Sequence, residues 1–251
     1  MAKNLRLLVL GGNGYAGRHI CEAAVLSGRF DVSSLNRTGF SSSSSLPSWS
    51  KKVEWHTGDV TDTDLSHELF PNVDIIFSTI GAFGSNAFME KVCGDINITA
   101  VTAAAKHKVS QFGFISSAQV GTLALKSNMP MYGYFHGKTR AEEAIKESYP
   151  EAHVIVRPGF LYGSRTFEIM GRSGSLPLQY LGIPITTLCT SPPLLDIVSK
   201  IPFLGKELQS MVSVQAMAEA TVASFLQPST AKLLVATDIR TFEKDACGEK
   251  N

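Results

Sequence analysis

Residues 8–17 read Leu-Val-Leu-Gly-Gly-Asn-Gly-Tyr-Ala-Gly, an apolar run that turns directly into closely spaced glycines. These glycines satisfy GxxGxxG and GxGxxG at once. Such a turn between a strand and a helix lets backbone amides and the positive end of a helix dipole approach a pyrophosphate. The segment therefore predicts a dinucleotide-binding loop, and the alternative is a glycine turn without a ligand. The predicted cofactor contacts in this loop are Gly11, Asn13, Gly14, Tyr15 and Gly17.

Outward from this loop, strand-like and helix-like runs alternate, which is the pattern of a doubly wound parallel sheet. We predict an α/β Rossmann fold with an NAD(P)-binding core at residues 1–166. Residues 167–242 are predicted as a small C-terminal substrate or flap lobe whose last helix and strand pack on the core, and residues 243–251 as a flexible tail. The predicted strands are residues 7–10, 32–35, 53–56, 74–78, 112–115, 154–156 and 232–236. The predicted helices are residues 18–26, 61–65, 87–106, 138–147 and 214–226. The Ser-rich residues 40–50 are predicted as a loop.

Composition narrows the class of protein. The chain has 251 residues, with 23 Lys+Arg against 22 Asp+Glu and 44% hydrophobic residues. This apolar content excludes intrinsic disorder for most of the chain, and a net charge of +1 argues against a nucleic-acid-binding protein. The cysteines, at positions 21, 93, 189 and 247, form no CxxC pair, so neither a disulfide scaffold nor a structural zinc site is expected, and a reducing compartment fits better.

One uncharged stretch is long enough to cross a bilayer. Residues 173–195 contain 23 uncharged residues, but four prolines and two glycines would break a spanning helix. We therefore predict no transmembrane segment and an apolar flap within residues 173–204. The first residues run straight into the first strand and leave no room for a secretory signal or a long transit peptide, so we expect an internal targeting signal or a presequence that this chain lacks.

The end of the second strand predicts the type of nucleotide. An NAD enzyme usually places Asp or Glu there, about 20 residues after the last glycine of the loop. This chain has Asn36, Arg37 and Thr38 instead. An arginine can pair with a 2′-phosphate, and no carboxylate at this position repels one. Asn36 and Arg37 are thus predicted cofactor contacts, with NADP(H) preferred over NAD(H); the alternative is that Arg37 begins a solvated loop.

Two further strand ends extend the predicted nucleotide site. Asp59 follows the third strand, where its carboxylate can reach an adenine amino group, or it caps the helix at residues 61–65. Residues 78–84, Ser-Thr-Ile-Gly-Ala-Phe-Gly, follow the fourth strand, and their small side chains let the backbone lie close to a dinucleotide, unless they form an ordinary strand-to-helix turn. The predicted contacts here are Asp59, Val60, Thr79 and Gly81.

A candidate catalytic set follows the fifth strand. That strand ends in a serine pair that includes Ser117, and Tyr134 lies 17 residues further on, four before Lys138. On a helix this spacing puts the phenol and the amine on one face. A neighbouring ammonium lowers the pKa of a phenol towards working pH, as a general acid for carbonyl reduction requires, and the serine hydroxyl can hold the substrate oxygen. The alternatives are that Tyr134 is a core aromatic, that Lys138 binds only the nicotinamide ribose, or that Tyr132 supplies the phenol.

Residues 157–163, Arg-Pro-Gly-Phe-Leu-Tyr-Gly, follow the sixth strand. Pro158 and Gly159 are predicted to shape the backbone beside the nicotinamide carboxamide, and Tyr162 to line the substrate side. The structural alternatives are a buried ion pair between Arg157 and a carboxylate, and a packed aromatic at Tyr162.

With GGNGYAG, GDVTD, YFHGK and RPGFLYG in this order, the chain resembles the extended and atypical short-chain dehydrogenase/reductases. STIGAFGSN, GYFHGKTRAEEAI and VIVRPGFLYG are similar to a mitochondrial subgroup. That subgroup includes the nucleotide-binding accessory subunit of respiratory complex I, the fungal coenzyme Q biosynthesis protein with this fold, and plant organellar relatives. The similarity covers residues 5–238, nearly the whole chain.

The resemblance implies a Rossmann domain with bound NADP(H) on the matrix side of the mitochondrial inner membrane, with plastid or cytoplasm as alternative locations. It also implies association with an inner-membrane complex or with quinone metabolism. Members of the subgroup often bind nucleotide structurally and have lost parts of the catalytic set; Tyr134 and Lys138 are both present here, whereas Gln215 stands where relatives often place Asp.

Two functions therefore compete. The first is an NADPH-dependent oxidoreductase acting on a hydrophobic carbonyl or a quinone-pathway substrate linked to ubiquinone biosynthesis. The second is a non-catalytic NADP(H)-binding structural or assembly subunit of a mitochondrial inner-membrane complex. A third, weaker hypothesis is a redox sensor that binds NADP(H) and releases a partner.

Overall fold

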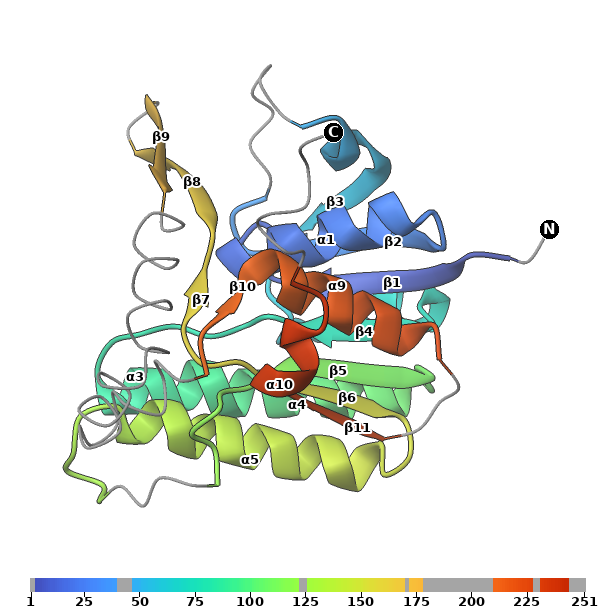
Figure 1. Cartoon of the computed structure of the whole chain (residues 1–251). Coiled ribbons are helices and arrows are strands. Elements are labelled where there is room, and N and C mark those ends of the chain that lie inside the picture. The colour runs from blue at the N-terminus through green and yellow to red at the C-terminus, as the bar shows by residue number, and fades with distance from the viewer. Residues whose placement is uncertain are drawn as a thin grey trace.

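A parallel seven-stranded sheet forms the middle layer of the molecule (Figure 1), with the strand order β11-β6-β5-β4-β1-β2-β3. This arrangement confirms the predicted α/β Rossmann fold class. The computed structural model describes residues 3–39, 47–121, 126–169, 172–177, 210–227 and 231–243. The strands are β1 Leu5–Leu10, β2 Phe30–Asn36, β3 Val53–Thr57, β4 Ile75–Ser78, β5 Gln111–Ile115, β6 His153–Arg157 and β11 Lys232–Val235.

The central strands form because both of their faces are covered. In β1, Leu7 and Val9 belong to one buried apolar cluster, whereas Leu8 and Leu10 belong to a second cluster on the opposite face. Strands buried on both sides are expected to be continuously apolar, which is why residues 7–10 indicate a strand without polar alternation.

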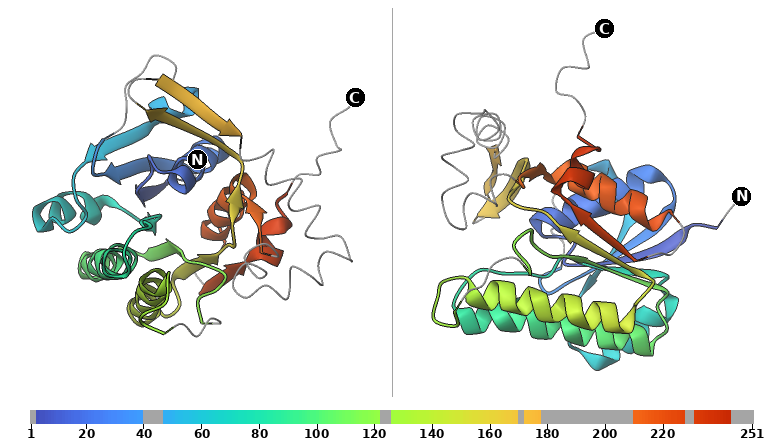
Figure 2. Two further views of the ribbon diagram at one scale, coloured as in Figure 1. Left: turned by 90° about the vertical axis from the view of Figure 1, so that its left-hand side faces the viewer. Right: turned by 60° about the horizontal axis from the view of Figure 1, so that its bottom comes forward.

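Helices cover the two faces of the sheet as outer layers, as Figure 2 shows. One layer packs on the cluster that contains Leu7, and the other on the cluster that contains Leu8. The first layer holds α1 Tyr15–Ser27, α9 Val214–Phe225 and α10 Ala236–Arg240; the second holds α2 Thr63–Leu69, α4 Ile96–Lys106 and α5 Tyr132–Ser148. The predicted helix at residues 214–226 and strand at residues 232–236 are thus joined to the core sheet and its helices, while α10 was not predicted.

The helix predicted at residues 87–106 is present but interrupted. It consists of α3 Asn86–Glu90, a π-helical turn Lys91–Asp95, and α4. Asn97 compensates for the irregular turn, because its buried amide nitrogen lies 3.1 Å from each of the carbonyl oxygens of Val92 and Cys93. The amide oxygen accepts a 2.6 Å hydrogen bond from the hydroxyl of Ser78, the last residue of β4. Asn97 therefore fixes the helix to the end of that strand.

Helix α5 packs unusually closely on the π-helical turn. A Cβ atom at Gly137 would lie 2.9 Å from the backbone nitrogen of Gly94, and one at Gly133 would overlap the carbonyl group of Asn86. The helix also begins six residues before the predicted start at residue 138, directly after Met131, which has φ 67°. Tyr134 and Lys138 consequently lie on one continuous helix, as the spacing argument requires.

Other differences from the prediction are local. Residues 48–50, predicted as loop, begin a 3₁₀ helix Ser48–Lys52, because the Trp49 side chain is buried in the core. Helix α2 begins two residues later than predicted and extends to Leu69. Two strand pairs were not predicted: β7 Leu161–Tyr162 with β10 Val212–Ser213, and β8 Ser164–Ile169 with β9 Arg172–Pro177.

Most of the predicted apolar flap at residues 173–204 lies outside the described residues, which include only its residues 173–177. Of the predicted tail at residues 243–251, the structure describes only residue 243. The described helices include none that combines the length and the apolar character needed to cross a membrane.

Candidate functional site

The strand order reverses at β1, whose neighbours are β2 and β4. In parallel α/β sheets such a switch point opens a crevice at the carboxyl ends of the strands, where ligands bind. A cavity of about 260 Å³ lies there. It is lined by Gly11, Asn13, Gly14, Leu35, Asn36, Arg37, Thr38, Gly58, Asp59, Val60, Thr79, Ile80, Gly81, Ala82, Val92 and Ile96. Most of the residues predicted to contact a cofactor are therefore brought together around one cavity.

Backbone hydrogen bonds within the glycine loop and to β2 fix the conformation of the loop. The Gly14 amide donates to the Gly11 carbonyl at 2.9 Å, and the Gly11 amide donates to Leu35 in β2 at 2.9 Å. Gly14 is the N-cap of α1, and no side chain of the described residues caps this helix. The N-terminus of α1 therefore faces the cavity with its positive dipole end, a favourable position for a phosphate.

Gly17 lies beneath the loop and does not line the cavity. A Cβ atom there would overlap the Gly11 carbonyl oxygen and lie 2.7 Å from the Cα of Gly12. We expect Gly17→Ala to lower the free energy of unfolding by about 2 kcal/mol, because overpacking against backbone cannot be relieved by a rotamer change. Thermal denaturation of the variant measures the loss. Gly84→Ala is the control, because its added methyl group meets only the movable ring of Phe88; equal losses in both variants would contradict the prediction.

Asn36 and Arg37 have different environments at the end of β2. Asn36 is buried, and its side-chain oxygen accepts a 2.9 Å hydrogen bond from the Asn13 amide. The Asn13 side chain in turn donates to the Gly39 carbonyl at 2.7 Å. Asn36 thus joins β2 to the glycine loop, while Arg37 is exposed at the cavity wall.

Asp59 forms the turn after β3 and does not cap α2. Its carboxylate accepts hydrogen bonds from the amide and the hydroxyl of Thr61, at 2.9 and 2.7 Å. These two bonds, together with the charges of Arg37 and Lys91, hold the pKa of Asp59 below its ordinary value. Asp62 caps α2 by accepting two backbone amides of the first turn, so the alternative that Asp59 is the helix cap is wrong.

Tyr134 and Lys138 meet beside the end of β5. The Lys138 side chain is only 3% exposed, and its Nζ donates a 2.6 Å hydrogen bond to the carbonyl of Ile115, the last residue of that strand. The same nitrogen lies 5.1 Å from the ring centroid of Tyr134. Tyr134 is half-buried and is part of neither buried core cluster. Ser117, two residues beyond Ile115, is buried at the same strand end.

Lys138 is also close to the cavity at the switch point of the sheet. A Cβ atom at the cavity residue Gly81 would lie 3.8 Å from Lys138 Nζ and 3.8 Å from Cys93 Sγ. Burial lowers the pKa of Lys138, and the nearby Cys93 and Glu142 partly oppose this effect. A buried amine between the cavity and a phenol is well placed to influence the protonation of that phenol.

Tyr132 packs against different residues from those that surround Tyr134. Its ring stacks on the imidazole of His136 at a centroid distance of 5.0 Å, and His136 Nδ1 lies 2.9 Å from a carboxylate oxygen of Glu90. Among the described residues, Lys138 contacts the aromatic rings of Tyr134 and Phe114 and not that of Tyr132.

A buried carboxylate, Glu142, lies one helical turn beyond Lys138. Its side chain is 2% exposed, and it accepts bonds of 2.8 and 2.6 Å from Arg157, 2.5 Å from the Ser116 hydroxyl and 3.1 Å from Lys146. Burial alone would raise the pKa of Glu142, but the bonds from Arg157 and Ser116 and the charge of Arg157 outweigh it and leave the pKa below its ordinary value. The structural alternative for Arg157, an ion pair with a buried carboxylate, is confirmed.

Pro158 and Gly159 hold the end of β6 in place. The Pro158 carbonyl accepts a 2.9 Å bond from the Ala118 amide, and the Gly159 amide donates to Ser210 at 2.9 Å. These bonds join the segment after β6 to the loop after β5 and to the residues that precede β10. Neither residue lines the cavity of about 260 Å³.

Two other tyrosines singled out in the sequence, Tyr162 and Tyr15, have structural contacts. Tyr162 donates a 3.1 Å hydrogen bond to Glu243, and its burial, with the charge of Glu243, raises the pKa of Tyr162 to about 12. The hydroxyl of Tyr15 lies near Gly163, and its ring packs edge-on against His19. Tyr15 does not line the cavity.

Sequence reasoning missed three residues of this site. Phe83 stacks on Tyr134 from a different element, and nothing in the sequence relates their positions. Asn97 looks like an ordinary helix residue until the π-helical turn is known. Glu142, four residues after Lys138, could have been found from its helical spacing alone.

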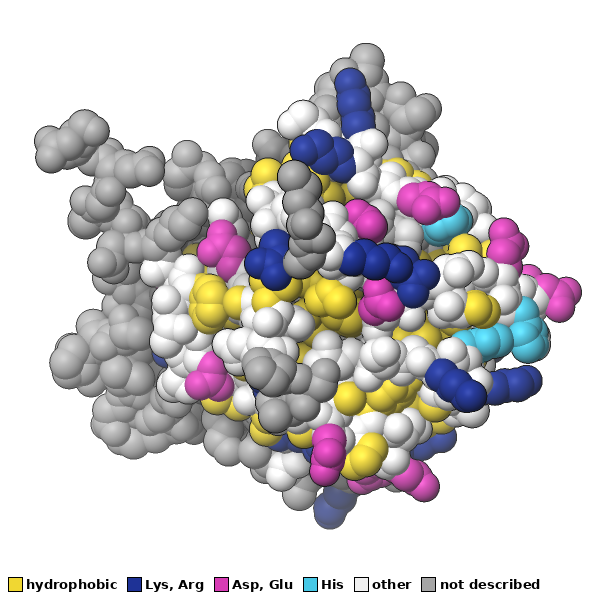
Figure 3. Space-filling view, turned by 90° about the vertical axis from the view of Figure 1, so that its right-hand side faces the viewer, with side chains coloured by type: hydrophobic (Ala, Val, Ile, Leu, Met, Phe, Trp, Pro, Cys, Tyr) yellow, Lys and Arg dark blue, Asp and Glu magenta, His cyan; other side chains and the backbone are white. Residues whose placement is uncertain are grey.

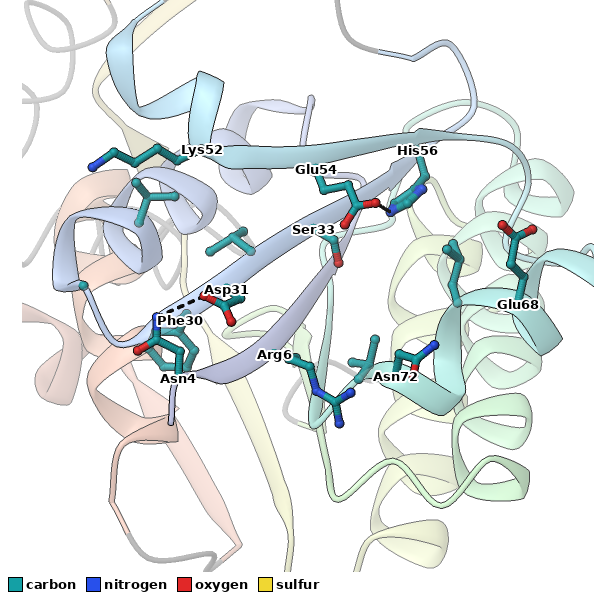
Figure 4. A pocket seen from close by; sticks show the side chains of 15 residues that line it. Asn4, Arg6, Phe30, Asp31, Ser33, Lys52, Glu54, His56, Glu68 and Asn72 are labelled. Carbon is teal, nitrogen blue, oxygen red and sulfur yellow. Dashed lines mark hydrogen bonds and ion pairs between the residues drawn. The ribbon is translucent and has the colours of Figure 1, made fainter. Parts of the chain in front are cut away.

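A larger cavity of about 760 Å³ lies beside the first residues of β1 and β2 and along β3, between the ends of α1 and α2 (Figure 4). Two of its basic side chains have acidic neighbours: Arg6 pairs with Asp74 at 3.0 Å, and His56 lies 3.6 Å from Glu54. Figure 3 shows that side chains of both charges are intermingled on this side of the molecule. The cavity lacks the glycine loop and the helix N-terminus that make the smaller cavity suited to phosphate. Among the described residues no group of three or more His, Cys, Asp or Glu side chains could hold a metal ion.

The family profile described as NAD(P)H-binding matches residues 11–176 of the chain. The match covers more than half of the sequence and includes the glycine loop, the cavity residues and the Tyr134–Lys138 pair. The protein belongs to this NAD(P)H-binding family.

Two curated relatives are similar over part of their length. An uncharacterized chloroplastic protein of Arabidopsis thaliana is 35% identical over 193 residues, which is 75% of this chain and 60% of the relative. MIOREX complex component 2 of Saccharomyces cerevisiae is 29% identical over 132 residues, 51% of this chain and 44% of the relative. The chain thus matches less than two thirds of either protein.

Solved structures share the fold at low identity. A UDP-N-acetylglucosamine 4-epimerase from Methanobrevibacter ruminantium is 17% identical with a TM-score of 0.60, covering 93% of this chain and 77% of that one. A UDP-glucuronic acid 4-epimerase from Bacillus cereus in complex with NAD is 16% identical with a TM-score of 0.61, covering 92% and 77%. These likenesses show the fold alone, a Rossmann-type α/β architecture.

Proposed function

We propose that this protein is an NADPH-dependent oxidoreductase that acts on a hydrophobic carbonyl or quinone-pathway substrate linked to ubiquinone biosynthesis. The observation that carries the proposal is the contact between Tyr134 and Lys138 beside the end of β5, next to the cavity wall at Gly81. A phenol and a buried amine at the edge of a dinucleotide cavity form an acid–base pair where a substrate carbonyl would meet a cofactor.

The donors around the cavity fit a phosphate-bearing nucleotide. The open N-terminus of α1 and the exposed guanidinium of Arg37 are both suited to anions. In the glycine loop, Gly11, Asn13 and Gly14 would hold the pyrophosphate, and Gly17 would allow the close packing of α1 beneath them. Tyr15 would contact the cofactor outside this cavity. Asn36, Arg37, Asp59 and Val60 would hold the adenosine half, and Thr79, Gly81, Lys138, Pro158 and Gly159 the nicotinamide half.

When bound, the reduced nicotinamide supplies the hydride for carbonyl reduction. Tyr134 would donate the proton to the carbonyl oxygen, and Ser117 would orient that oxygen through a hydrogen bond. Lys138 would stabilise the phenolate that remains, and its bond to Ile115 keeps the amine beside the end of β5.

The preference for NADPH rests on Arg37. We expect Arg37→Ser to weaken NADPH binding about 10- to 100-fold, because a charge-assisted bond to the 2′-phosphate is lost, and to leave NADH binding unchanged. Calorimetric titration of the full chain with each nucleotide measures both affinities.

Arg29→Ser is the matched control, because Arg29 is exposed and precedes β2 at its other end. It removes one positive charge far from the cavity and should change neither affinity. If Arg37→Ser and Arg29→Ser behave alike, the 2′-phosphate is not held by Arg37 and the assignment of NADPH fails.

The alternative function is a non-catalytic NADP(H)-binding subunit that supports assembly of an inner-membrane complex. The observation in its favour is the similarity to a protein named as a component of the MIOREX complex. In this function nucleotide acts as a ligand that stabilises the fold, by about 3 kcal/mol at concentrations far above Kd. Two measurements separate the two functions. NADPH-dependent turnover of hydrophobic ketones or quinones would favour the oxidoreductase, and co-purification with membrane proteins without turnover would favour the assembly subunit.

We also propose that the protein works in an organelle, in mitochondria on the matrix side of the inner membrane. The names of its relatives, one chloroplastic and one a MIOREX component, support an organelle in general. Fractionation of cells that express the full-length protein tests this location against plastid and cytoplasm.

A further inference from the structure

We propose that Phe83 determines specificity by binding a flat, conjugated ring of the substrate beside Tyr134. The substrate class is then a planar unsaturated or aromatic carbonyl compound. The inference rests on the proposed function for the identity of the reacting group, but the ring-binding surface itself can be tested without any reaction.

Phe83 combines exposure with a fixed aromatic contact. Its side chain is 73% exposed, yet its ring stacks on Tyr134 with a centroid distance of 5.1 Å and an interplanar angle of 19°. The residue directly follows Ala82, which lines the nucleotide cavity. An open aromatic face therefore stands between the proposed cofactor site and the proposed acid.

The backbone around Phe83 is restrained by several contacts. The Ala82 carbonyl accepts a weak hydrogen bond from Cys93 Sγ at 3.7 Å. Ser85 caps α3 through a 3.3 Å bond from the Phe88 amide, and Gly84 lies against the Phe88 ring. Because the backbone is held on both sides of Phe83, the connection between β4 and α3 fixes the position from which the exposed ring projects.

The stacked pair favours a planar partner. Aromatic rings gain affinity from offset stacking beyond the burial of their area, and a puckered saturated ring cannot make this contact over its whole face. A flat ring placed on the open face of Phe83 would extend the stack that already includes Tyr134. A saturated ring of the same skeleton would gain only the burial of apolar area.

The test compares binding of 2-naphthol and decahydro-2-naphthol, which share one carbon skeleton and one hydroxyl group. Calorimetry on the full chain, with and without NADPH, gives the ratio of their affinities. We expect the wild type to prefer 2-naphthol about fivefold, Phe83→Leu to remove this preference, and Phe83→Tyr to restore it. Phe88→Leu is the matched control, because Phe88 is 44% exposed on the neighbouring helix and is not stacked on Tyr134.

Each outcome separates this inference from the proposed function. Equal affinities in the wild type, no binding of either compound, or a preference that survives Phe83→Leu would overturn the role of Phe83, even if the enzyme reduces other carbonyls. A preference that depends on Phe83, with no NADPH oxidation on any planar ketone or quinone, would support the ring site and reject the oxidoreductase.

Discussion

Replacing Tyr134 with phenylalanine is expected to lower kcat/KM for carbonyl reduction about 10²- to 10⁴-fold, the usual contribution of a positioned general acid. The ring of Tyr134 is held by Phe83 and lies 5.1 Å from Lys138 Nζ, so the variant loses the hydroxyl without losing its packing. NADPH oxidation with a planar ketone or quinone as acceptor measures the rate.

Two measurements make this result specific. NADPH affinity should stay within about twofold of the wild type, because Tyr134 does not line the nucleotide cavity. Tyr132→Phe is the matched control and should retain turnover, since Tyr132 stacks on His136. Full activity in Tyr134→Phe together with loss in Tyr132→Phe would move the acid to Tyr132. Absence of turnover in the wild type, with normal NADPH binding and membrane-protein co-purification, would favour the assembly subunit.

Replacing Glu142 with glutamine is expected to lower the free energy of unfolding by about 3 kcal/mol at neutral pH. The change leaves the Arg157 guanidinium, half-buried at the end of β6, without its counter-ion, and removal of one partner from a buried pair typically costs about 3–5 kcal/mol. We choose the lower end because Arg157 retains some contact with solvent. Chemical denaturation of wild type and variant measures the difference.

The effect should depend on pH with a defined sign. The pKa of Glu142 is lower in the folded protein than in the unfolded chain, so its contribution is fully present above the unfolded pKa and is lost as pH falls through the folded pKa. The wild type should therefore lose stability in acid, and the difference from Glu142→Gln should shrink there. Lys146→Gln removes the more exposed partner of Glu142 and should cost less than about 1 kcal/mol. A loss that is equal at neutral and acid pH would show that lost packing, not charge, destabilises Glu142→Gln.

The sequence predicted the sheet well for a physical reason. Parallel strands buried on both faces are continuous apolar runs, and β1 and β4 are recognisable without knowledge of their neighbours. The start of α5 was missed because residues 132–137 include two glycines, which weaken any local helix signal. Tertiary packing on α3 and the π-helical turn stabilises those residues as helix, and no local pattern encodes that packing.

The candidate site was predictable only in part. The glycine loop, Arg37 and the Tyr134–Lys138 spacing are local patterns with a direct physical meaning. Phe83 and Asn97 act through contacts between elements, which the order of residues does not reveal. The interpretation of Asp59 as the cap of α2 is wrong for a similar reason. Whether Asp59 or Asp62 caps the helix depends on where the chain turns after β3.

The close approach of α5 to the π-helical turn also limits how this protein can diverge. Gly133 and Gly137 each come immediately before one member of the proposed acid–base pair, Tyr134 and Lys138. A side chain at either glycine would push α5 away from Asn86 or Gly94 and carry both functional groups with it. Any residue larger than glycine at either position therefore requires a shift of α5, which would also change the position of Tyr134 and Lys138 relative to the end of β5.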